Sequence, residues 1–170
     1  MSTRTPKTVL CVLVTGMIFM AACAEAQPPN KVLGTWRMLS AQLDPQGRNI
    51  PAYGPRPNSL LVFTEDLHVI EVMTDSTVPK FASKVRGNGT AEENRAAMAG
   101  GIGWFGTYTV DAQGDLSGDR VDGSTFPNWV GDVRTNKDIQ LVVEGDRMRE
   151  TFLRPEGTQV VITWQRVGRP

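Results

Sequence analysis

Apolar and polar residues alternate with a period of two along most of the chain after residue 30. This is the pattern of β-strands that bury one face, and clusters of Gly, Pro, Asn and Asp separate the alternating segments as turns do. Short connections favour an antiparallel meander, and a meander of eight strands removes its edges by closing. The sequence therefore predicts an all-β, eight-stranded antiparallel up-and-down barrel, with strands at 30–43, 58–63, 67–73, 102–110, 116–124, 133–143, 147–153 and 158–167.

One segment interrupts the strand pattern and predicts a short helix. Thr90 and Glu93 have the spacing of a capping box, in which each side chain accepts a hydrogen bond from the other residue's backbone amide. Gly100 and Gly101 then end the helix. Residues 50–57 contain three prolines, so they predict an irregular loop over one end of the fold.

Residues 1–26 have the pattern of a secretory signal peptide. Two basic residues precede an apolar run at 9–22, and Ala24 and Ala26 then match the A-x-A cleavage pattern. A membrane anchor or a buried helix is the alternative, but an apolar run of this length is short for a bilayer span. We expect a cleaved signal peptide, export to the periplasm or secretion, and a single mature domain at 27–170 without a membrane span.

Both cysteines of the chain, Cys11 and Cys23, fall within this signal segment. The mature domain therefore has no disulfide, in spite of the oxidising compartments to which export leads. Cys23 follows the sequence Met-Ala-Ala, which loosely resembles the lipobox of bacterial lipoproteins. A lipoprotein anchored at Cys23 is thus the alternative to cleavage after Ala26.

The charge balance argues against two classes of partner. The chain has 18 basic and 18 acidic residues, and 16 and 17 of them remain when residues 1–26 are removed. No basic stripe is left that could neutralise the phosphates of a nucleic acid. An anionic membrane surface finds no electrostatic anchor in the mature domain for the same reason.

His68 is the only histidine of the chain, and the mature part has no cysteine. A zinc site with nitrogen and sulfur ligands is therefore excluded, and we expect neither a metal nor a cofactor. A Ser-His-Asp triad would also need His68, but the chain has no G-x-S-x-G nucleophile elbow. The strand at 67–73 is apolar on both faces, so the pattern leaves open whether His68 is a structural or surface residue or takes part in catalysis.

Aromatic residues on one face of the strand at 102–110 are suited to lining a cavity inside the barrel. Trp104 offers a flat ring, Gly106 leaves a gap, and Tyr108 adds a phenol as a polar handle, although plain core packing is the alternative. The loop at 126–129 either caps the open barrel end or forms a packed corner. The predicted ligand-binding residues are Trp104, Tyr108, Phe63, Met73, Asn128 and Trp129.

Glu150 lies between Met148 and Phe152 at the strand period. A carboxylate on an apolar barrel face is costly unless it is paired, and Arg166 on the last strand is a candidate partner. If it faced a ligand inside the barrel, the carboxyl would have a raised pKa, which suits a general acid or base. The interpretation that we favour is that the strand twists Glu150 to solvent.

The start of the first strand, Gly34-Thr35-Trp36, resembles the G-x-W signature of lipocalins. In that superfamily the Trp plugs the closed end of the barrel, and an Arg near the last strand packs across it, a place that Arg166 matches. A closer match is to the bacterial and fungal lipocalin-like domain proteins. This resemblance covers Val32 to Val167 and is carried by Leu33–Arg37 (LGTWR), Leu61–Thr64 (LVFT), Phe105–Asp111 (FGTYTVD) and, most specifically, Gly123–Gly131 (GSTFPNWVG).

One position departs from the family pattern. Members often carry one or two histidines on the strand before the last of these blocks, where this chain has Asp119 and Arg120. Any role of those histidines is therefore not transferred. The resemblance implies a calycin-type barrel with a pocket and structural roles for Gly34, Trp36 and Arg166, but no defined reaction.

Three functions fit these observations. The leading hypothesis is an exported protein that binds a small hydrophobic or aromatic molecule inside the barrel. The alternative is a cofactor-free cyclase, isomerase or lyase that acts on a hydrophobic substrate, with Tyr108, His68 and Glu150 as the candidate proton-transfer residues. The third is a barrel filled with side chains that acts through its surface loops. The sequence leaves the ligand and the oligomeric state open.

Overall fold

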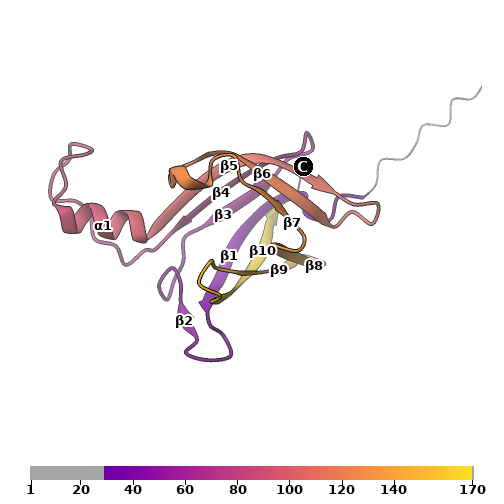
Figure 1. Cartoon of the computed structure of the whole chain (residues 1–170), viewed down its shortest axis with the longest axis horizontal. Helices are drawn as coiled ribbons and strands as arrows, with labels where there is room; N and C mark the ends of the chain where they lie inside the picture. The colour runs from indigo at the N-terminus through magenta and orange to yellow at the C-terminus, as the bar shows by residue number, and fades with distance from the viewer. Residues whose placement is uncertain (1–28, 170) are drawn as a thin grey trace, which may run out of the picture.

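The strands form one antiparallel sheet that bends into a nearly closed barrel (Figure 1). The structure, a computed structural model, describes residues 29–169 of the 170-residue chain. The predicted signal peptide and both cysteines lie outside the described residues. The elements are β1 (Gly34–Leu43), β2 (Ile50–Pro51), β3 (Leu60–Phe63), β4 (His68–Thr74), α1 (Ala91–Ala99), β5 (Gly101–Val110), β6 (Leu116–Ser124), η1 (Pro127–Trp129), β7 (Val133–Thr135), β8 (Ile139–Glu144), β9 (Arg147–Leu153) and β10 (Gln159–Gly168).

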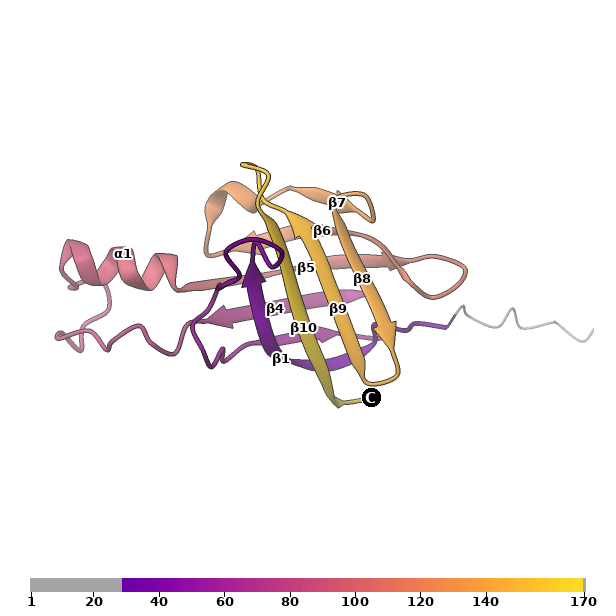
Figure 2. The same ribbon diagram turned by 90° about the horizontal axis from the view of Figure 1, so that it is seen from below.

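Hydrogen bonds join nine strands in the order β7-β6-β5-β4-β3-β1-β10-β9-β8, and the short β2 pairs with the end of β1. Because β7 and β8 follow each other in the chain and stand at the two ends of this order, the sheet is a ring that is open at one seam. Figure 2 shows β1, β10, β9 and β8 crossing β4, β5 and β6 at a steep angle. The barrel is thus flattened into two layers, with the core between them.

The all-β fold with one helix is confirmed, but the predicted count of eight strands is wrong. The predicted strand at 133–143 is two strands, because Thr135 and Asp138 form a turn between β7 and β8. The backbone N–H and the hydroxyl of Thr135 both donate to Oδ2 of Asp138 at 2.8 Å. These bonds occupy groups that a continuous strand would offer to its neighbours. The other strand that was not predicted, β2, lies within the predicted loop at 50–57.

The predicted helix is present together with its capping box. The backbone N–H of Glu93 donates to Thr90 Oγ1 at 3.2 Å, and that of Thr90 donates to Glu93 Oε2 at 2.8 Å. The helix α1 has no buried residue and projects away from the barrel (Figure 1). No helix of the described residues is long and apolar enough to cross a membrane.

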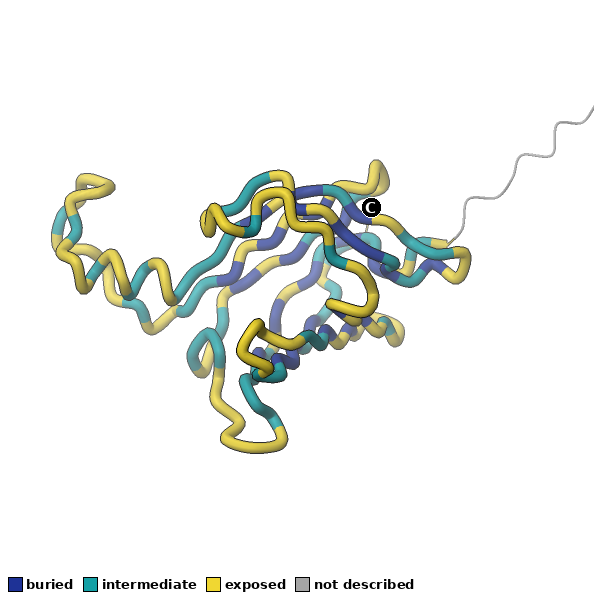
Figure 3. The backbone as a smooth tube through the Cα atoms, viewed as in Figure 1, coloured by how far each residue is buried: buried dark blue, intermediate teal, exposed yellow. Residues whose placement is uncertain are grey.

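Alternating burial along the strands decides which side chains fill the interior (Figure 3). On β4, Val69, Glu71 and Met73 are buried, whereas Ile70 and Val72 are exposed. Because side chains of a strand alternate between its two faces, the first set points into the barrel. A carboxylate therefore lies among the inward side chains of a strand whose outward face is apolar.

Trp104, Gly106 and Tyr108 are the corresponding inward residues of β5. A Cβ atom at Gly106 would lie 1.8 Å from the carbonyl oxygen of Arg120, so only glycine lets β6 pass at this point. The register between β5 and β6 shifts here, which marks a β-bulge. The gap predicted at Gly106 is thus occupied by the neighbouring backbone.

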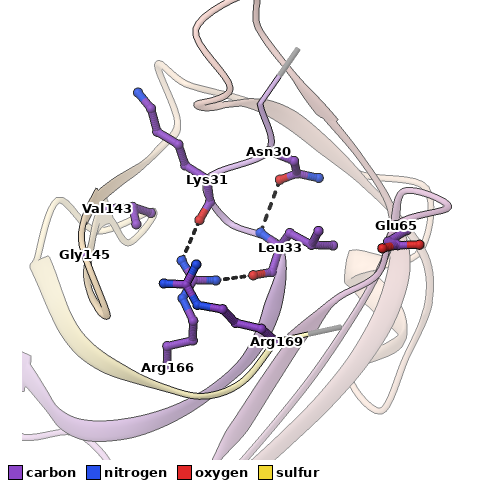
Figure 4. A pocket seen from close by; sticks show the side chains of 8 residues that line it. All are labelled: Asn30, Lys31, Leu33, Glu65, Val143, Gly145, Arg166 and Arg169. Atoms are coloured by element: carbon purple, nitrogen blue, oxygen red, sulfur yellow. Dashed lines mark hydrogen bonds between the residues drawn. The ribbon is translucent and has the colours of Figure 1, made fainter. Parts of the chain in front are cut away.

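Trp36 and Arg166 close one end of the barrel. Trp36 is fully buried, and its indole N–H donates to the carbonyl of Val32 at 2.7 Å. The Cζ atom of Arg166 lies 3.9 Å from the centroid of the Trp36 ring, a cation–π contact. The guanidinium also donates to the backbone carbonyls of Lys31 and Leu33 (Figure 4). Arg166 therefore fastens the segment before β1 across the end of the barrel.

Gly34 begins β1 beside this plug. Its φ is 117°, and a Cβ atom there would lie 2.5 Å from the carbonyl oxygen of Gly168 on β10. An L side chain at this position would be strained in its own backbone and would also clash with the neighbouring strand. The glycine of the G-x-W sequence is thus needed for the backbone to turn into the first strand.

The Arg166 plug predicts a loss of stability in the variant Arg166→Met. This variant keeps an apolar side chain but loses the bonds to two carbonyls and the charge over the Trp36 ring. We expect the free energy of unfolding to fall by about 2 kcal/mol, measured by urea denaturation. Arg169→Met is the matched control, because Arg169 makes only an exposed ion pair with Asp146 and should matter by less than about 0.5 kcal/mol. Equal losses in the two variants would contradict the role of the plug.

Candidate functional site

A cavity of about 260 Å³ opens inside the barrel at the end away from Trp36. Loops surround its mouth: Tyr53 comes from the segment after β2, Trp129 from η1, and Pro155 from the turn between β9 and β10. A much narrower space of about 10 Å³ adjoins it deeper in the barrel, since both are lined by Glu71 and Glu150. The interior is therefore filled at one end and hollow at the other.

Two glutamates from opposite layers lie in this interior. Glu71 of β4 and Glu150 of β9 each have only 4% of their surface exposed. The indole N–H of Trp104 donates to Glu71 Oε2 at 2.5 Å, and that of Trp164 donates to Glu150 Oε2 at 2.9 Å. The second oxygen of Glu71, Oε1, is buried and has no hydrogen-bond partner among the described residues. Such an atom is costly to bury unless something else reaches it.

Burial raises the pKa of Glu71 to about 8 and that of Glu150 to about 7, because a charged carboxylate is disfavoured away from water. The negative charge of Glu150 raises the pKa of Glu71 further, whereas the indole hydrogen bonds and the charge of Arg134 lower both values. The two carboxyls therefore titrate as a pair close to neutral pH and hold about one proton between them there.

Arg134 and Asp119 form an ion pair beside the glutamates. The guanidinium of Arg134 binds both carboxylate oxygens of Asp119, with Nε to Oδ1 at 2.8 Å and Nη2 to Oδ2 at 3.0 Å. Its Cζ atom also lies 4.5 Å from the ring centroid of Trp104. Burial raises the pKa of Asp119, and Arg134 opposes this shift. Because Nε and Nη2 of Arg134 are engaged by Asp119, Arg134 neutralises the glutamate pair only in part.

Apolar side chains make up the rest of the cavity wall. Met73, Val121 and Ile139 are buried, while Trp129 and Phe152 are partly exposed toward the mouth. Tyr53 adds a phenol whose pKa is raised to about 12, mainly by burial and also by the charge of Glu71. The cavity thus combines apolar walls with a small polar group of titratable side chains, which is the composition of a small-molecule site.

A family model described as the lipocalin-like domain matches residues 33–167. The chain belongs to the lipocalin-like domain family. The match runs from β1 through nearly all of β10, so it covers the whole barrel, and the predicted resemblance is confirmed. No curated protein matches the chain. A lipocalin-like barrel with a hollow end indicates ligand binding in general.

The structure divides the predicted ligand-binding residues of this lipocalin-like barrel into separate groups. Met73 and Trp129 line the cavity. Phe63 and Trp104 line the narrow space below it and not the cavity itself. Asn128 is exposed on η1 and is not a lining residue of the cavity. The aromatic loop predicted to cap the open end thus contributes Trp129 to the cavity wall.

Tyr108 lies at the filled end, away from the cavity. Its hydroxyl donates to the carbonyl of Thr64 at 2.7 Å and accepts a hydrogen bond from Asn30 Nδ2 at 2.6 Å. Its ring packs edge-on against Phe63 with centroids 4.9 Å apart. Both polar functions of the phenol are therefore used inside the protein, which leaves Tyr108 as a core residue of the lipocalin-like barrel rather than a polar handle for a ligand.

The three candidate proton-transfer residues do not converge. The His68 side chain is 57% exposed on the outward face of β4, and its Nδ1 lies 3.3 Å from Asp66 Oδ2. Tyr108 is at the filled end, and only Glu150 reaches the cavity. A catalytic role for the three together is therefore inconsistent with where they lie.

The prediction that Glu150 turns to solvent is wrong. Glu150 keeps the strand alternation and points inward like Met148, because the indole of Trp164 supplies a hydrogen-bond donor inside the barrel. The candidate partner Arg166 is used elsewhere, over Trp36 and on two backbone carbonyls. An inward carboxylate was expected to need a partner, but the partner is an indole and not a guanidinium.

Three further residues of the site were not predicted from the sequence: Glu71, Tyr53 and Arg134. Strand alternation puts Glu71 on one face of β4 with Val69 and Met73, but alternation alone does not say which face is the interior. Tyr53 lies in a segment without a regular pattern, and Arg134 is the middle residue of the three-residue strand β7. Only the pairing of the strands brings these three side chains to Glu150.

Three larger hollows open on the surface of the lipocalin-like barrel. One, of about 500 Å³, lies at the closed end between Arg166, Lys31 and Glu65 (Figure 4). The second, of about 770 Å³, separates α1 and the segment at 81–87 from the outer face of β4 and β5. The third, of about 480 Å³, lies between the start of β1 and the end of β3. None of the three is lined by a buried carboxylate, so the interior cavity is the candidate site.

The buried pair predicts that stability depends on pH. The carboxyl of Glu71 ionises near pH 4.5 when exposed and near pH 8 in the folded protein, so the folded state binds more protons between these values. The free energy of unfolding must then fall as the pH rises from about 4.5 to 8. Glu71→Gln keeps an acceptor for Trp104 and removes this fall. Between pH 5 and pH 9, we expect the free energy of unfolding of the variant to rise by about 1 to 3 kcal/mol relative to that of the native protein.

Urea denaturation at pH 5, 7 and 9 measures this gain. The control is Glu144→Gln, which neutralises an exposed carboxylate at the end of β8. The stability of this control relative to the native protein should change little over the same range. Parallel pH profiles for Glu71→Gln and the native protein would contradict a raised pKa at Glu71.

Proposed function

We propose that the protein is an exported binding protein that holds a small molecule with a hydrophobic or aromatic body in the open half of its barrel. The observation that carries this proposal is the interior cavity of about 260 Å³, with apolar walls around two buried carboxyl groups. A cavity of this kind binds mainly by removing apolar ligand surface from water, at roughly 25 cal/mol per Å² before the costs of association. The carboxyl pair then fixes the orientation of one polar group of the ligand.

The walls of the proposed site are Met73, Ile139 and Phe152 inside and Tyr53 and Trp129 at the mouth. The two residues at the mouth lie outside the strands, Tyr53 in the segment after β2 and Trp129 in η1, whereas the inner three belong to strands. Rigid strands therefore shape the bottom of the site, while loop residues control access to it. The likeness to lipocalin-like proteins supports a binding role for the barrel as a whole.

Export is part of the proposal and rests on the sequence of the first 26 residues. The apolar run and the A-x-A pattern point to a cleaved signal peptide and a periplasmic or secreted protein. A small molecule outside the cytoplasm is diluted and exposed to solvent, so a soluble carrier or sensor with an enclosed apolar site suits that location.

A second candidate function is proton-transfer catalysis without a cofactor, such as an isomerisation, cyclisation or elimination. It is favoured by the position of Glu71 and Glu150, which line one cavity and whose burial raises the pKa of both carboxyls toward neutral pH. One carboxyl would then be an acid and the other a base at the working pH. The two functions differ in what the protein releases. A catalyst releases a molecule that it has changed, whereas a binding protein releases the molecule that it bound.

Native mass spectrometry of the protein purified from its own export compartment tests the binding function. We expect an adduct of one small organic molecule per barrel that is lost on denaturation. Ile139→Phe puts a larger side chain into the cavity and should lose the adduct while the protein still melts cooperatively. Ile70→Phe is the matched control on the exposed face of β4 and should keep the adduct. An adduct that is absent from the native protein, or equally abundant in both variants, would contradict the proposal.

The same preparation distinguishes the catalytic alternative. If the glutamates transfer protons, Glu150→Gln should hold a molecule that the native protein converts on mixing. If the native protein and Glu150→Gln hold the same molecule and the native protein does not convert it, the function is binding.

Export predicts a mature N-terminus at Gln27. Intact-mass measurement and N-terminal sequencing of the protein from the producing cells should give this residue. Replacing Ala24 and Ala26 by Leu should block cleavage, because the signal peptidase requires small side chains at both positions. A mature chain that begins at a lipid-modified Cys23 would favour the lipoprotein alternative, and an intact Met1 in a cytoplasmic fraction would contradict export.

A further inference from the structure

The interior cavity carries more negative than positive charge. Its lining includes the guanidinium groups of Arg134 and Arg154, but the acidic residues outnumber them. Arg134 is engaged by both oxygens of Asp119, and Arg154 lies in the turn at the mouth, 41% exposed beside Glu156. The acidic lining residues are Glu71, Asp132, Asp138 and Glu150.

Glu71 provides an independent sign that the site is incomplete. Its side chain is buried in the centre of the barrel, and Oε1 has no hydrogen-bond partner among residues 29–169. Trp104 satisfies only the other oxygen. Once Glu71 is ionised, its buried oxygen without a donor is costly, and a donor brought in by a ligand would remove that cost.

We infer that the cavity binds a molecule with one cationic nitrogen on an apolar body, and that the nitrogen lies against the carboxylates of Glu71 and Glu150. The inference rests on the proposed function, because it names the ligand class for the same cavity. An ammonium group has three N–H donors, enough to reach Glu71 Oε1 and Glu150 together. The apolar walls of Met73, Ile139 and Phe152 would contact the remainder of the ligand.

Other ligand classes fit the site less well. A fatty acid or another anion would bring a third carboxylate to a pair that already repel each other. An aromatic hydrocarbon would leave Glu71 Oε1 without a donor. Among the described residues no group of three or more His, Cys, Asp or Glu side chains is placed to hold a metal ion. An organic cation satisfies both the charge and the orphaned oxygen.

The pair of glutamates makes binding of such a cation depend on pH. The charged groups around the pair are Asp119 of β6 and Arg134 of β7, with Asp132, Asp138 and Arg154 nearer the mouth. Near neutral pH the pair holds a proton, which a bound ammonium must displace. The affinity for an amine should therefore rise with pH through the range in which the pair ionises, up to the pKa of the amine itself. A neutral molecule of the same shape should show no such rise.

Three probes of similar size test the inference by two-dimensional nitrogen–proton NMR. The probes are 2-phenylethylamine, 2-phenylethanol and phenylacetate, titrated at pH 6, 7.5 and 9. The indole N–H signals of Trp104 and Trp164 report directly on the site, since both donate to the glutamates. At pH 9 we expect the amine to bind at least about tenfold more tightly than the alcohol, as a charge-assisted hydrogen bond in a buried site requires, and phenylacetate more weakly than either. The affinity for the amine should rise by about tenfold from pH 6 to pH 9.

Variants make the result specific to the pair. The double variant Glu71→Gln/Glu150→Gln should bind the amine and the alcohol within about twofold of each other, because both charges are gone while each Gln carbonyl still accepts the indole N–H of its tryptophan. Glu144→Gln, which removes a charge outside the cavity, should keep the native preference. Equal binding of amine and alcohol to the native protein would overturn the inference and leave the proposed binding function intact. No shift of either indole signal with any probe would count against both.

Discussion

Each of the two buried carboxylates accepts an indole N–H from the neighbouring strand, and the interior of the barrel depends on this pairing. Glu71 on β4 lies directly opposite Trp104 on β5, while Glu150 on β9 is bound by Trp164 on β10. The same two tryptophans are 5% and 0% exposed, so they are also main components of the core. The burial of these two rings is therefore coupled to the burial of the two carboxylates. Loss of either acid would leave an indole N–H without its partner, and loss of either tryptophan would leave a buried charge alone.

A polar layer across the middle of the barrel follows from this pairing. Below it, Phe63, Tyr108 and Trp36 pack closely up to the plug that Arg166 fastens. Above it lies the cavity, which the two carboxylates and Arg134 line, because charged groups resist complete desolvation. The hollow end is thus a consequence of where the charges lie as well as of backbone shape. The filled end supplies stability, and the hollow end supplies the cavity.

Local patterns were enough to predict most elements of this fold, but the site needed information that a single strand does not contain. The capping box at Thr90 and the inward row of β5 depend on neighbours in sequence, and both could be read directly. Glu150 was recognised as unusual, yet its direction was misjudged, since its partner Trp164 comes from a different strand. Strand alternation puts Glu71 on the face of β4 that holds Val69 and Met73, but alternation alone does not say that this face is interior. Tyr53 could not be predicted as a site residue, because it lies in a proline-rich loop whose position depends on the folded barrel.

The carboxyl pair is better explained by a ligand than by stability. Apolar side chains of similar size at both positions would pack against the tryptophan rings and avoid the desolvation of two acids, a replacement that often stabilises a protein. Without a ligand, the desolvation of the two acids destabilises the barrel most in mildly alkaline solution, because both groups are charged there. A cation placed between them would reverse the sign of the effect, so the same charges that destabilise the empty cavity would select its occupant. Stored electrostatic repulsion in a rigid, preformed site becomes binding free energy when the complementary charge arrives.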